Sequence, residues 1–384
     1  MQVLQGHSQA SSTAALLSEA CADWGDARPD IIFAFCSSAQ EPAELVSELR
    51  ERYPETLVVG CTTAGEHLSG KHFKSSCVLT ALVDSGVRWS ATLIEDIANI
   101  DEEIAHTATA ALFDELDISP DRHFDPEQFF CLLLVDGLAM AEERVATLLA
   151  DALEGVRLVG GSAGDDLAFE ETLVFYDGGV HAGAACVVMG HAIEAKAEFI
   201  KHQNFVETPR SLVITRADLA TRTVHEIDGY PAAQAYGAAL GLLPSELSEE
   251  VANVHPVMFK CNGENYMRGI QRFNEDGSIT FYCGIEEGMV LEIADHEEMV
   301  HALSQDLEDG DPADFMIAFN CIQRAMESDR TDSHDDICQV MNRHSRHVIG
   351  FDTYGEQLDG LHINQTLVAL ALRHKPSNPE EVSR

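Results

Sequence analysis

A unit that occurs twice constrains the fold of this chain more than any other feature. The apolar run DIIFAFCSS is followed by a helical pattern, EPAELVSELRERYP, and then by a second apolar run with a small-residue loop, TLVVGCTTAGE. Further along, FFCLLLVDGL, AEERVATLLADALEG and VRLVGGSAGDD repeat this order, and each copy continues into two more strand-like runs. Gly60 and Gly160 hold equivalent places. Residues 31–95 and 129–190 are therefore predicted to be copies of one strand–helix–strand unit with a hairpin.

The loop that ends each second run is made of Gly, Ser, Thr and Ala residues. Such a loop can leave backbone N–H groups uncovered, which is how α/β folds often cradle anions. The same small residues also allow two layers to pack closely, so both interpretations stay open. The spacing matches neither a P-loop nor the GxGxxG pattern, and no nucleotide site is predicted.

The pattern changes near residue 205. Strand-like runs then alternate with Asn-Gly and Asp-Gly turns, and helical stretches lie between them, which is typical of an antiparallel sheet. The predicted fold class is α/β plus α+β, with a duplicated strand–helix–strand N-terminal half and a mostly antiparallel-sheet C-terminal half. The predicted domains are residues 1–205 and a ligand-binding domain at 206–384.

Charge and hydropathy exclude several classes of partner. The formal net charge is −41, and such a field repels nucleic acid and anionic lipid. The acidic charge then indicates binding to basic proteins, a need for solubility, or adaptation to high salt. The sequence holds no apolar run of about 18 residues, so no membrane span is predicted. The first residues lack the basic and apolar regions of a signal peptide.

Several stretches together resemble one family. VVGCTTAGE, LVGGSAGDD and GVHAGAACVVM are similar to the N-terminal region of FIST domain proteins, and VHEIDGYPAAQAYGAALG, AFNCIQR and GFDTYGEQLDGLHINQT to the C-terminal region. The resemblance covers nearly the whole chain and implies a cytoplasmic sensory protein of signal transduction. The closing stretch is most similar to the bacterial nitric-oxide-sensing haem type (NosP). That implies haem b as cofactor and a sensor histidine kinase as partner. The alternative is a haem-free sensor of a small metabolite such as an amino acid.

His362 is the first candidate for a haem ligand. It lies in a strand-like run beside Leu361 and Ile363, and Asn364 shares its face of the strand. A neutral imidazole can bind iron through one nitrogen while an amide orients the ring or bonds a diatomic ligand. A core histidine with backbone partners would explain the same pattern.

The turn before His362 supplies further cofactor-binding candidates, namely Tyr354, Glu356 and Gln357. Because a lone buried carboxylate is costly, Glu356 is predicted to pair with Arg324 or Arg268 if it is buried. A fixed arginine would also suit a carboxylate ligand. A purely structural network explains these residues equally well. In either case, they are predicted to wall the pocket of the C-terminal region.

Other histidines are alternative metal ligands. His344 and His347 are three residues apart, which on a helix places both rings on one face, although the adjacent Arg343 and Arg346 favour a solvated helix end. His225 and His202 are further alternatives.

Catalysis is not predicted. Cys61 follows a strand, where a nucleophile could lie, but the second copy has Gly161 at that place, and no His–Asp arrangement can be tied to it. The chain is therefore predicted not to be an enzyme.

Overall fold

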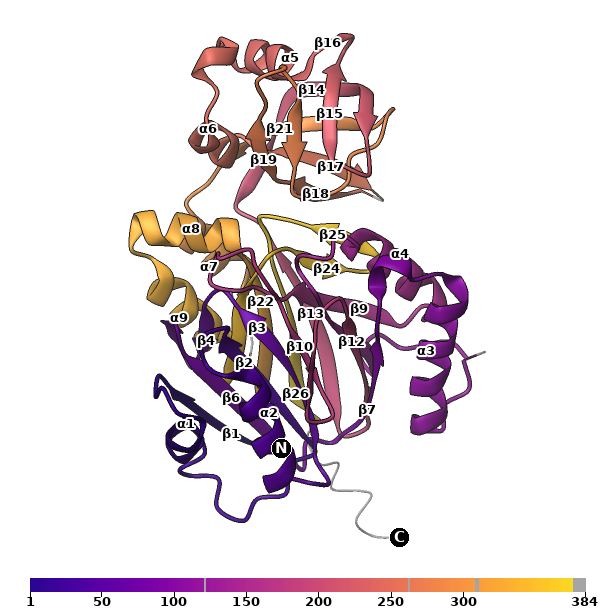
Figure 1. The fold of residues 1–384 in the computed structure, drawn as a ribbon, viewed down its shortest axis with the longest axis vertical. Coiled ribbons are helices and arrows are strands. Elements are labelled where there is room, and N and C mark those ends of the chain that lie inside the picture. Colours follow the sequence, from indigo (N-terminus) through magenta and orange to yellow (C-terminus); the bar gives the residue numbers. More distant parts are fainter. Residues whose placement is uncertain (121, 262, 308–310, 376–384) are drawn as a thin grey trace.

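The computed structural model has two lobes (Figure 1). It describes residues 1–120, 122–261, 263–307 and 311–375. Within these residues, the larger lobe holds three six-stranded sheets, and the smaller lobe is an antiparallel sheet with two helices. The predicted mixed α/β class is confirmed. In the described part of the chain, no helix combines the length and the apolar character needed to cross a membrane.

Three apolar runs become central strands that are buried on both faces. They are β2 (Ile31–Ser37), β8 (Phe129–Val135) and β22 (Phe315–Cys321). Alternate side chains of each strand, such as Phe33, Leu132 and Phe319, point into one core shared by the three sheets. The side chains between them pack under helices on the outside. Because neither face meets water, the sequence reads as a continuous apolar run at each strand.

Each central strand begins a copy of the same unit, and there are three copies where the sequence predicted two. In the first copy, the strand is followed by α2 (Pro42–Arg52), β3 (Leu57–Thr63), β4 (Glu66–Leu68), β5 (Lys71–Phe73), β6 (Cys77–Val83) and β7 (Val87–Ile94). In the second, it is followed by α4 (Glu142–Ala152), β9 (Arg157–Ser162), β10 (Val174–Tyr176), β11 (Gly179–His181), β12 (Ala185–Ala192) and β13 (Ala195–His202). In the third, it is followed by α8 (Ile322–Thr331), α9 (His334–His344), β23 (Val348–Thr353), β24 (Glu356–Leu358), β25 (Leu361–Ile363) and β26 (Leu367–His374).

The three sheets have the same strand order. Read in one direction, they run β1-β6-β2-β3-β10-β11, β7-β12-β8-β9-β24-β25 and β13-β26-β22-β23-β4-β5. The N-terminal strand β1 (Gln2–Ser8) takes the edge place that β7 and β13 take in the other two sheets. The shared order of the first two sheets confirms the predicted duplication.

The short hairpin of each copy pairs with a strand of another copy and so belongs to a neighbouring sheet. The β4–β5 hairpin pairs with β23, β10–β11 with β3, and β24–β25 with β9. The register makes Glu66, Val174 and Glu356 equivalent, since they face Phe351, Cys61 and Gly161 in the three sheets. Every sheet therefore contains strands from two different copies.

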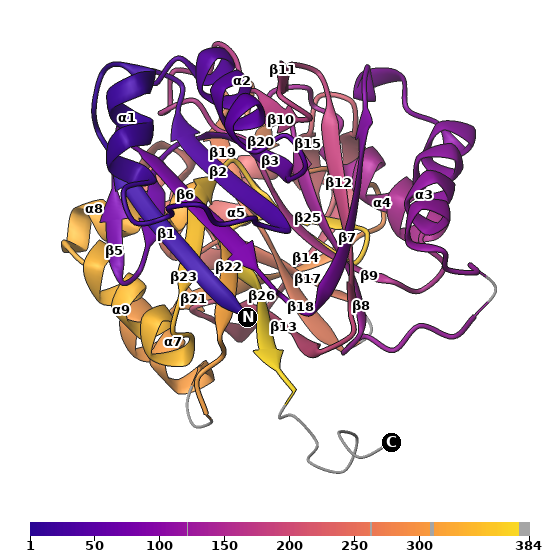
Figure 2. The ribbon, with the colours of Figure 1, turned by 90° about the horizontal axis from the view of Figure 1, so that it is seen from below.

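Helices cover the outer face of each sheet, as the view from below shows (Figure 2). The first sheet is covered by α1 (Thr13–Ala20) and α2, the second by α3 (Glu102–Leu116) and α4, and the third by α7 (Met299–Asp306) and α9. The helical link of the third copy is divided into α8 and α9. This division is one reason why the third copy is hard to see in the sequence.

The smaller lobe is inserted between β13 and α7. Its elements are β14 (Phe205–Asp218), β15 (Thr223–Ile227), β16 (Tyr230–Pro231), α5 (Ala232–Leu240), α6 (Glu249–Val254), β17 (Val257–Cys261), β18 (Glu264–Arg268), β19 (Ile270–Phe273), β20 (Ile279–Phe281) and β21 (Val290–His296). It has its own apolar core, which includes Tyr236 and Phe281. The antiparallel sheet predicted for the C-terminal half is this inserted lobe, and the third α/β copy follows it.

Candidate functional site

The inserted lobe meets the third copy at a polar junction. Arg268, at the end of β18, donates from Nη1 to the carbonyl oxygen of His362 at 3.0 Å. The backbone N–H of Gly269 donates to Asn364 Oδ1 at 3.4 Å. On the other side, Asn253 of α6 accepts from Gln323 Nε2 at 3.1 Å. The structure therefore brings the predicted residues His362, Asn364 and Arg268 together, with Gln357 paired to His362 across the β24–β25 hairpin.

Buried polar atoms without a hydrogen-bond partner gather at this junction. Among the described residues they are Arg268 Nε, His362 Nε2, Gln323 Oε1, Gln357 Oε1 and Gln365 Oε1. A buried donor or acceptor left unpaired costs about 1–3 kcal/mol. Native proteins satisfy nearly all such groups with protein, water or ligand atoms. The junction consequently presents two donors and three acceptors that are free to bind something.

Two glycines allow these groups to approach the backbone. A Cβ at Gly269 would lie 2.2 Å from Gln323 Oε1, and one at Gly355 would lie 2.8 Å from His362 Nε2 and 3.2 Å from Asn364 Nδ2. Any side chain at either position would therefore displace a polar group of the junction. Asn364 contacts both approaches, because its Cβ lies 3.3 Å from the Cβ position at Gly269 and its Nδ2 lies 3.2 Å from that at Gly355.

The hydrogen bonds of His362 determine which of its nitrogens carries the proton. Gln357 Nε2 lies 3.1 Å from His362 Nδ1, 2.9 Å from Ser162 Oγ and 3.3 Å from the carbonyl oxygen of Gly355, so its two N–H groups are shared among three neighbours. Because the carbonyl oxygen of Gly355 can only accept a hydrogen bond, the Gln357 side-chain atom that faces both it and the ring must be the amide nitrogen. His362 Nδ1 therefore accepts a hydrogen bond from that nitrogen. Burial lowers the pKa of His362, and the neutral ring then carries its proton on Nε2.

This tautomer does not fit a haem ligand. An axial histidine binds iron through a bare Nε2 and donates from Nδ1–H to an acceptor. His362 has the reverse arrangement. Haem b at this residue therefore stays a prediction from the resemblance, and no chemical step is derived from it.

The remaining pocket candidates have structural partners. Tyr354 donates from its hydroxyl to Asp165, and the buried Arg324 donates to Asn320 Oδ1 at 3.0 Å and to Asn204 Oδ1 at 2.7 Å. Glu356 accepts from the hydroxyls of Thr353 and Thr366, both at 2.6 Å. The prediction that it pairs with an arginine was wrong, because among the described residues Arg324 donates to Asn320 and Asn204, and Arg268 donates to the carbonyl oxygen of His362. Burial instead raises the pKa of Glu356 to about 7, which lets the group avoid a buried charge.

The alternative metal ligands do not converge. The helix α9 ends at His344, so the predicted helical pair with His347 was wrong. His347 Nδ1 contacts Gln5 Oε1 at 3.1 Å, His202 Nδ1 contacts Asp306 Oδ2 at 2.6 Å, and His225 lies on β15 of the inserted lobe. Burial and the charge of Arg324 lower the pKa of His202 to about 4.

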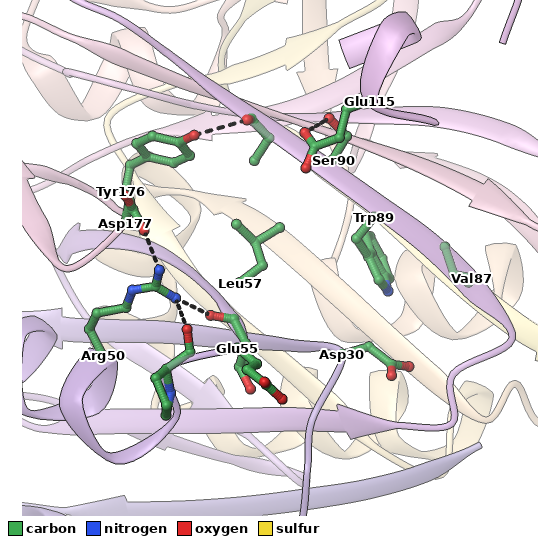
Figure 3. Close-up of a pocket in the computed structure, with 13 residues that line it drawn as sticks. Asp30, Arg50, Glu55, Leu57, Val87, Trp89, Ser90, Glu115, Tyr176 and Asp177 are labelled. Carbon is green, nitrogen blue, oxygen red and sulfur yellow. Dashed lines mark hydrogen bonds and ion pairs between the residues drawn. The ribbon is translucent and has the colours of Figure 1, made fainter. Parts of the chain in front are cut away.

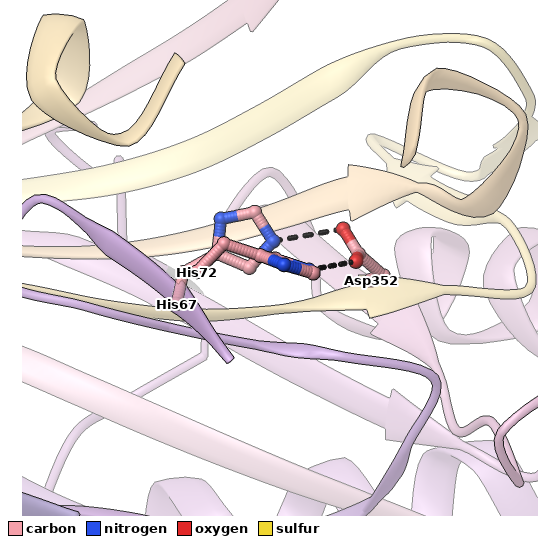
Figure 4. A group of neighbouring side chains, drawn as sticks. All are labelled: His67, His72 and Asp352. Atoms are coloured by element: carbon pink, nitrogen blue, oxygen red, sulfur yellow. Dashed lines mark hydrogen bonds and ion pairs between the residues drawn. The ribbon is translucent and has the colours of Figure 1, made fainter. Parts of the chain in front are cut away.

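A different histidine cluster was missed from the sequence. His67 Nε2 lies 2.8 Å from Asp352 Oδ1, and His72 Nε2 lies 2.7 Å from Asp352 Oδ2 (Figure 4). Burial alone would raise the pKa of Asp352, but its two histidine neighbours hold that pKa well below its usual range. The histidines come from the β4–β5 hairpin and the acid from the end of β23. The available signal was the likeness of GEHLSGKH to GEQLDGLH, which aligns His72 with His362.

A surface cavity of about 420 Å³ lies elsewhere, between β7, β10 and the end of α2 (Figure 3). Its charged residues largely bind one another or the backbone: Arg50 pairs with Asp177 at 3.1 Å, and Glu115 accepts from Ser90 Oγ at 2.5 Å. None of the predicted site residues lines it.

Comparison with known families decides what the chain is related to. The model of the FIST N domain matches residues 30–230, and the model of the FIST C domain matches residues 232–359. The chain belongs to the FIST family. FIST domains are sensor domains of signal transduction, so the sensory reading of this FIST protein is supported at that level. No named relative supports the nitric-oxide-sensing type.

Other comparisons add little about chemistry. A search of curated proteins finds no match. Among solved structures, a cyanuric acid hydrolase from A. caulinodans aligns with 9% identity and a TM-score of 0.39, covering 97% of this chain and 99% of that one. A second cyanuric acid hydrolase has the same identity and coverage and a TM-score of 0.35. Both are hydrolases, which contradicts the prediction that the FIST protein is not an enzyme. At these TM-scores the likeness assigns no reaction to it.

Proposed function

We propose that this FIST protein is a sensor that binds a small zwitterionic metabolite, such as an amino acid, at the junction between the third copy and the inserted lobe. The observation that supports this is the group of unpaired buried atoms. Arg268 Nε and His362 Nε2 are donors, and the side-chain oxygens of three glutamines are acceptors. A carboxylate accepts from such donors, and an ammonium group donates to amide oxygens.

A ligand at this place would act on the relation between the two lobes. Arg268 belongs to the inserted lobe, whereas His362 and Gln323 belong to the core. A molecule that bonds to both sides stabilises one arrangement of the lobes over others, which is what a ligand must do to change a conformational equilibrium. A signalling protein would respond to that arrangement, and the resemblance suggests a sensor histidine kinase.

The test uses Arg268→Gln, with Arg216→Gln as its control. Arg216 also lies in the inserted lobe, but it is exposed and pairs with Glu226. Wild-type protein is screened against the twenty amino acids by thermal shift, and hits are measured by calorimetry. We expect at least one hit. Arg268→Gln should weaken it at least about tenfold, or about 1.4 kcal/mol, and Arg216→Gln should leave it unchanged.

A haem titration separates this proposal from the alternative ligand. The proposal fails if no amino acid binds or if both variants weaken binding equally. It is also overturned if wild-type protein takes up one equivalent of haem with a Soret change that His362→Ala abolishes. In that case, haem b and nitric oxide sensing would become the assignment for the junction.

A further inference from the structure

We propose that His67, His72 and Asp352 form a buried binding site for a divalent first-row transition metal ion, with Zn²⁺ as the probe (Figure 4). The three side chains are contributed by two different copies of the repeated unit, and they meet where the β4–β5 hairpin joins β23. This site is separate from the junction proposed for the metabolite.

The ligand set and its dimensions suit such an ion. One ligand atom from each residue lies within 4.8 Å of the others. Two imidazole nitrogens and a carboxylate oxygen are ligands that zinc accepts, at about 2.0–2.2 Å each. Tetrahedral ligation at that length separates ligand atoms by about 3.3 Å, whereas the hydrogen-bonded pairs here are 2.8 and 2.7 Å apart. Since no two of the three ligand atoms are more than 4.8 Å apart, changes in separation of up to about 1.5 Å would admit the ion in place of the bridging protons.

Neighbouring groups hold the ligands in a suitable orientation. Cys338 Sγ lies 3.3 Å from His67 Nδ1, so the nitrogen away from the carboxylate has a partner of its own and Nε2 can face the ion. Asn320 Nδ2 donates to Asp352 Oδ1 at 2.8 Å. The ring of His72 stacks on His334 with centroids 3.9 Å apart. Such outer contacts fix the direction of metal ligands and tune their affinity.

The other two copies show that the fold does not require these residues. At the places of His67, His72 and Asp352, one sheet has Gln357, His362 and Ser162, and another has Phe175, Val180 and Thr62. An apolar hairpin, β10–β11, therefore pairs antiparallel with β3 in the equivalent register. A buried carboxylate between two histidines is costly where packing alone would suffice, which argues that the cluster is kept for a ligand.

Access to the site is possible from one side. His67 and Asp352 are almost fully buried, while the side chain of His72 keeps 6% of its surface exposed. Asp335 accepts from the backbone N–H of His72 at 3.1 Å, and Asp329 pairs with His334 at 2.8 Å. Asp335 therefore places a carboxylate beside the exposed edge, whereas Asp329 also pairs with Lys74 Nζ at 2.6 Å.

The test replaces each ligand by the residue that another copy carries at the same place. The variants are His67→Gln, His72→Val and Asp352→Ser, and the control is His301→Gln on the exposed face of α7. Chelator-treated full-length protein is titrated with Zn²⁺ by calorimetry and with Co²⁺ by visible absorption, and folding is checked by circular dichroism. We expect one equivalent of Zn²⁺ and a Co²⁺ ligand-field band in the wild type and the control. Each ligand variant should bind Zn²⁺ at least roughly 100-fold more weakly, because outer-contact changes alone cost 10–100-fold.

Two outcomes would overturn the metal site. One is a wild-type protein that takes up less than stoichiometric Zn²⁺ at micromolar concentration. The other is folded Asp352→Ser protein that binds Zn²⁺ as tightly as the control, which would place the ion on surface histidines. Since Gln, Val and Ser already occupy these places in the same fold, the variants are expected to fold, and at least one of the three gives a clear answer.

Discussion

Replacing Glu66 and Glu356 together by glutamine should remove a large part of the dependence of stability on pH between pH 5 and 8. Both carboxyl groups are fully buried at equivalent places and are held by hydroxyl groups. Burial raises the pKa of Glu66 to about 8 and that of Glu356 to about 7, from 4.5. The folded protein thus keeps two protons that the unfolded chain releases near pH 4.5.

The sign of the effect follows from this difference. Unfolding releases protons within this window, so the stabilisation is complete below pH 4.5 and is lost as the pH rises through 7 and 8. At about 1.4 kcal/mol per pKa unit, the rises of the two pKa values from 4.5 to about 8 and about 7 correspond to a loss of up to roughly 8 kcal/mol. Glutamine does not ionise, so the double variant should gain stability relative to the wild type as the pH rises.

Urea unfolding at a series of pH values measures this gain. The control is Glu51→Gln on the exposed face of α2, which should follow the wild-type profile. Parallel profiles for the double variant and the wild type would mean that both carboxyl groups titrate near their ordinary pKa.

Gly160→Ala is expected to destabilise the protein by at least about 3 kcal/mol, at the upper end of overpacking effects. A Cβ at Gly160 would lie 2.0 Å from the carbonyl oxygen of Leu133 on the neighbouring central strand. The equivalent Gly60 and Gly350 meet the carbonyl oxygens of Ala34 and Ala318 at 1.7 and 2.4 Å. Backbone of a central strand cannot move away as a flexible side chain can.

The matched control is Gly183→Ala. That glycine has φ +60 and no heavy atom near its Cβ position, so only the left-handed backbone is unfavourable, by about 1 kcal/mol. Urea midpoints for both variants give the comparison. Equal effects at the two positions would show that the strands separate easily at Gly160.

The sequence predicted those parts of the fold that lie close together along the chain. The apolar runs at β2 and β8, the helices after them and the equivalent Gly60 and Gly160 were sufficient for the duplication. The third copy was not recognised in the sequence because the inserted lobe separates it from the second copy and because its helix is divided. Its Gly355-Glu356 pair was read as a pocket turn, although it matches Gly65-Glu66 of the first copy.

Site residues close in sequence were found more readily than partners distant in sequence. His362, Asn364 and Gln357 were predicted because they crowd one motif, and the structure places them at the junction with Arg268. The tautomer of His362 and the hydroxyl partners of Glu356 depend on side-chain geometry that no spacing encodes. The cluster around Asp352 was missed because its histidines lie 285 and 280 residues away and are joined to it only by the exchanged hairpin.

The exchange of hairpins has a consequence for how the chain reaches its fold. The β4–β5 hairpin is made early in synthesis, yet its partner β23 comes near the end of the chain. Until then, that hairpin and the free edge of β9 have no strand to pair with. Contacts so distant in sequence slow folding, and unpaired edges invite association with other chains. The core shared by the three sheets can therefore close only after β23 and β24 have been synthesised, and the unpaired edges stay open to association until then.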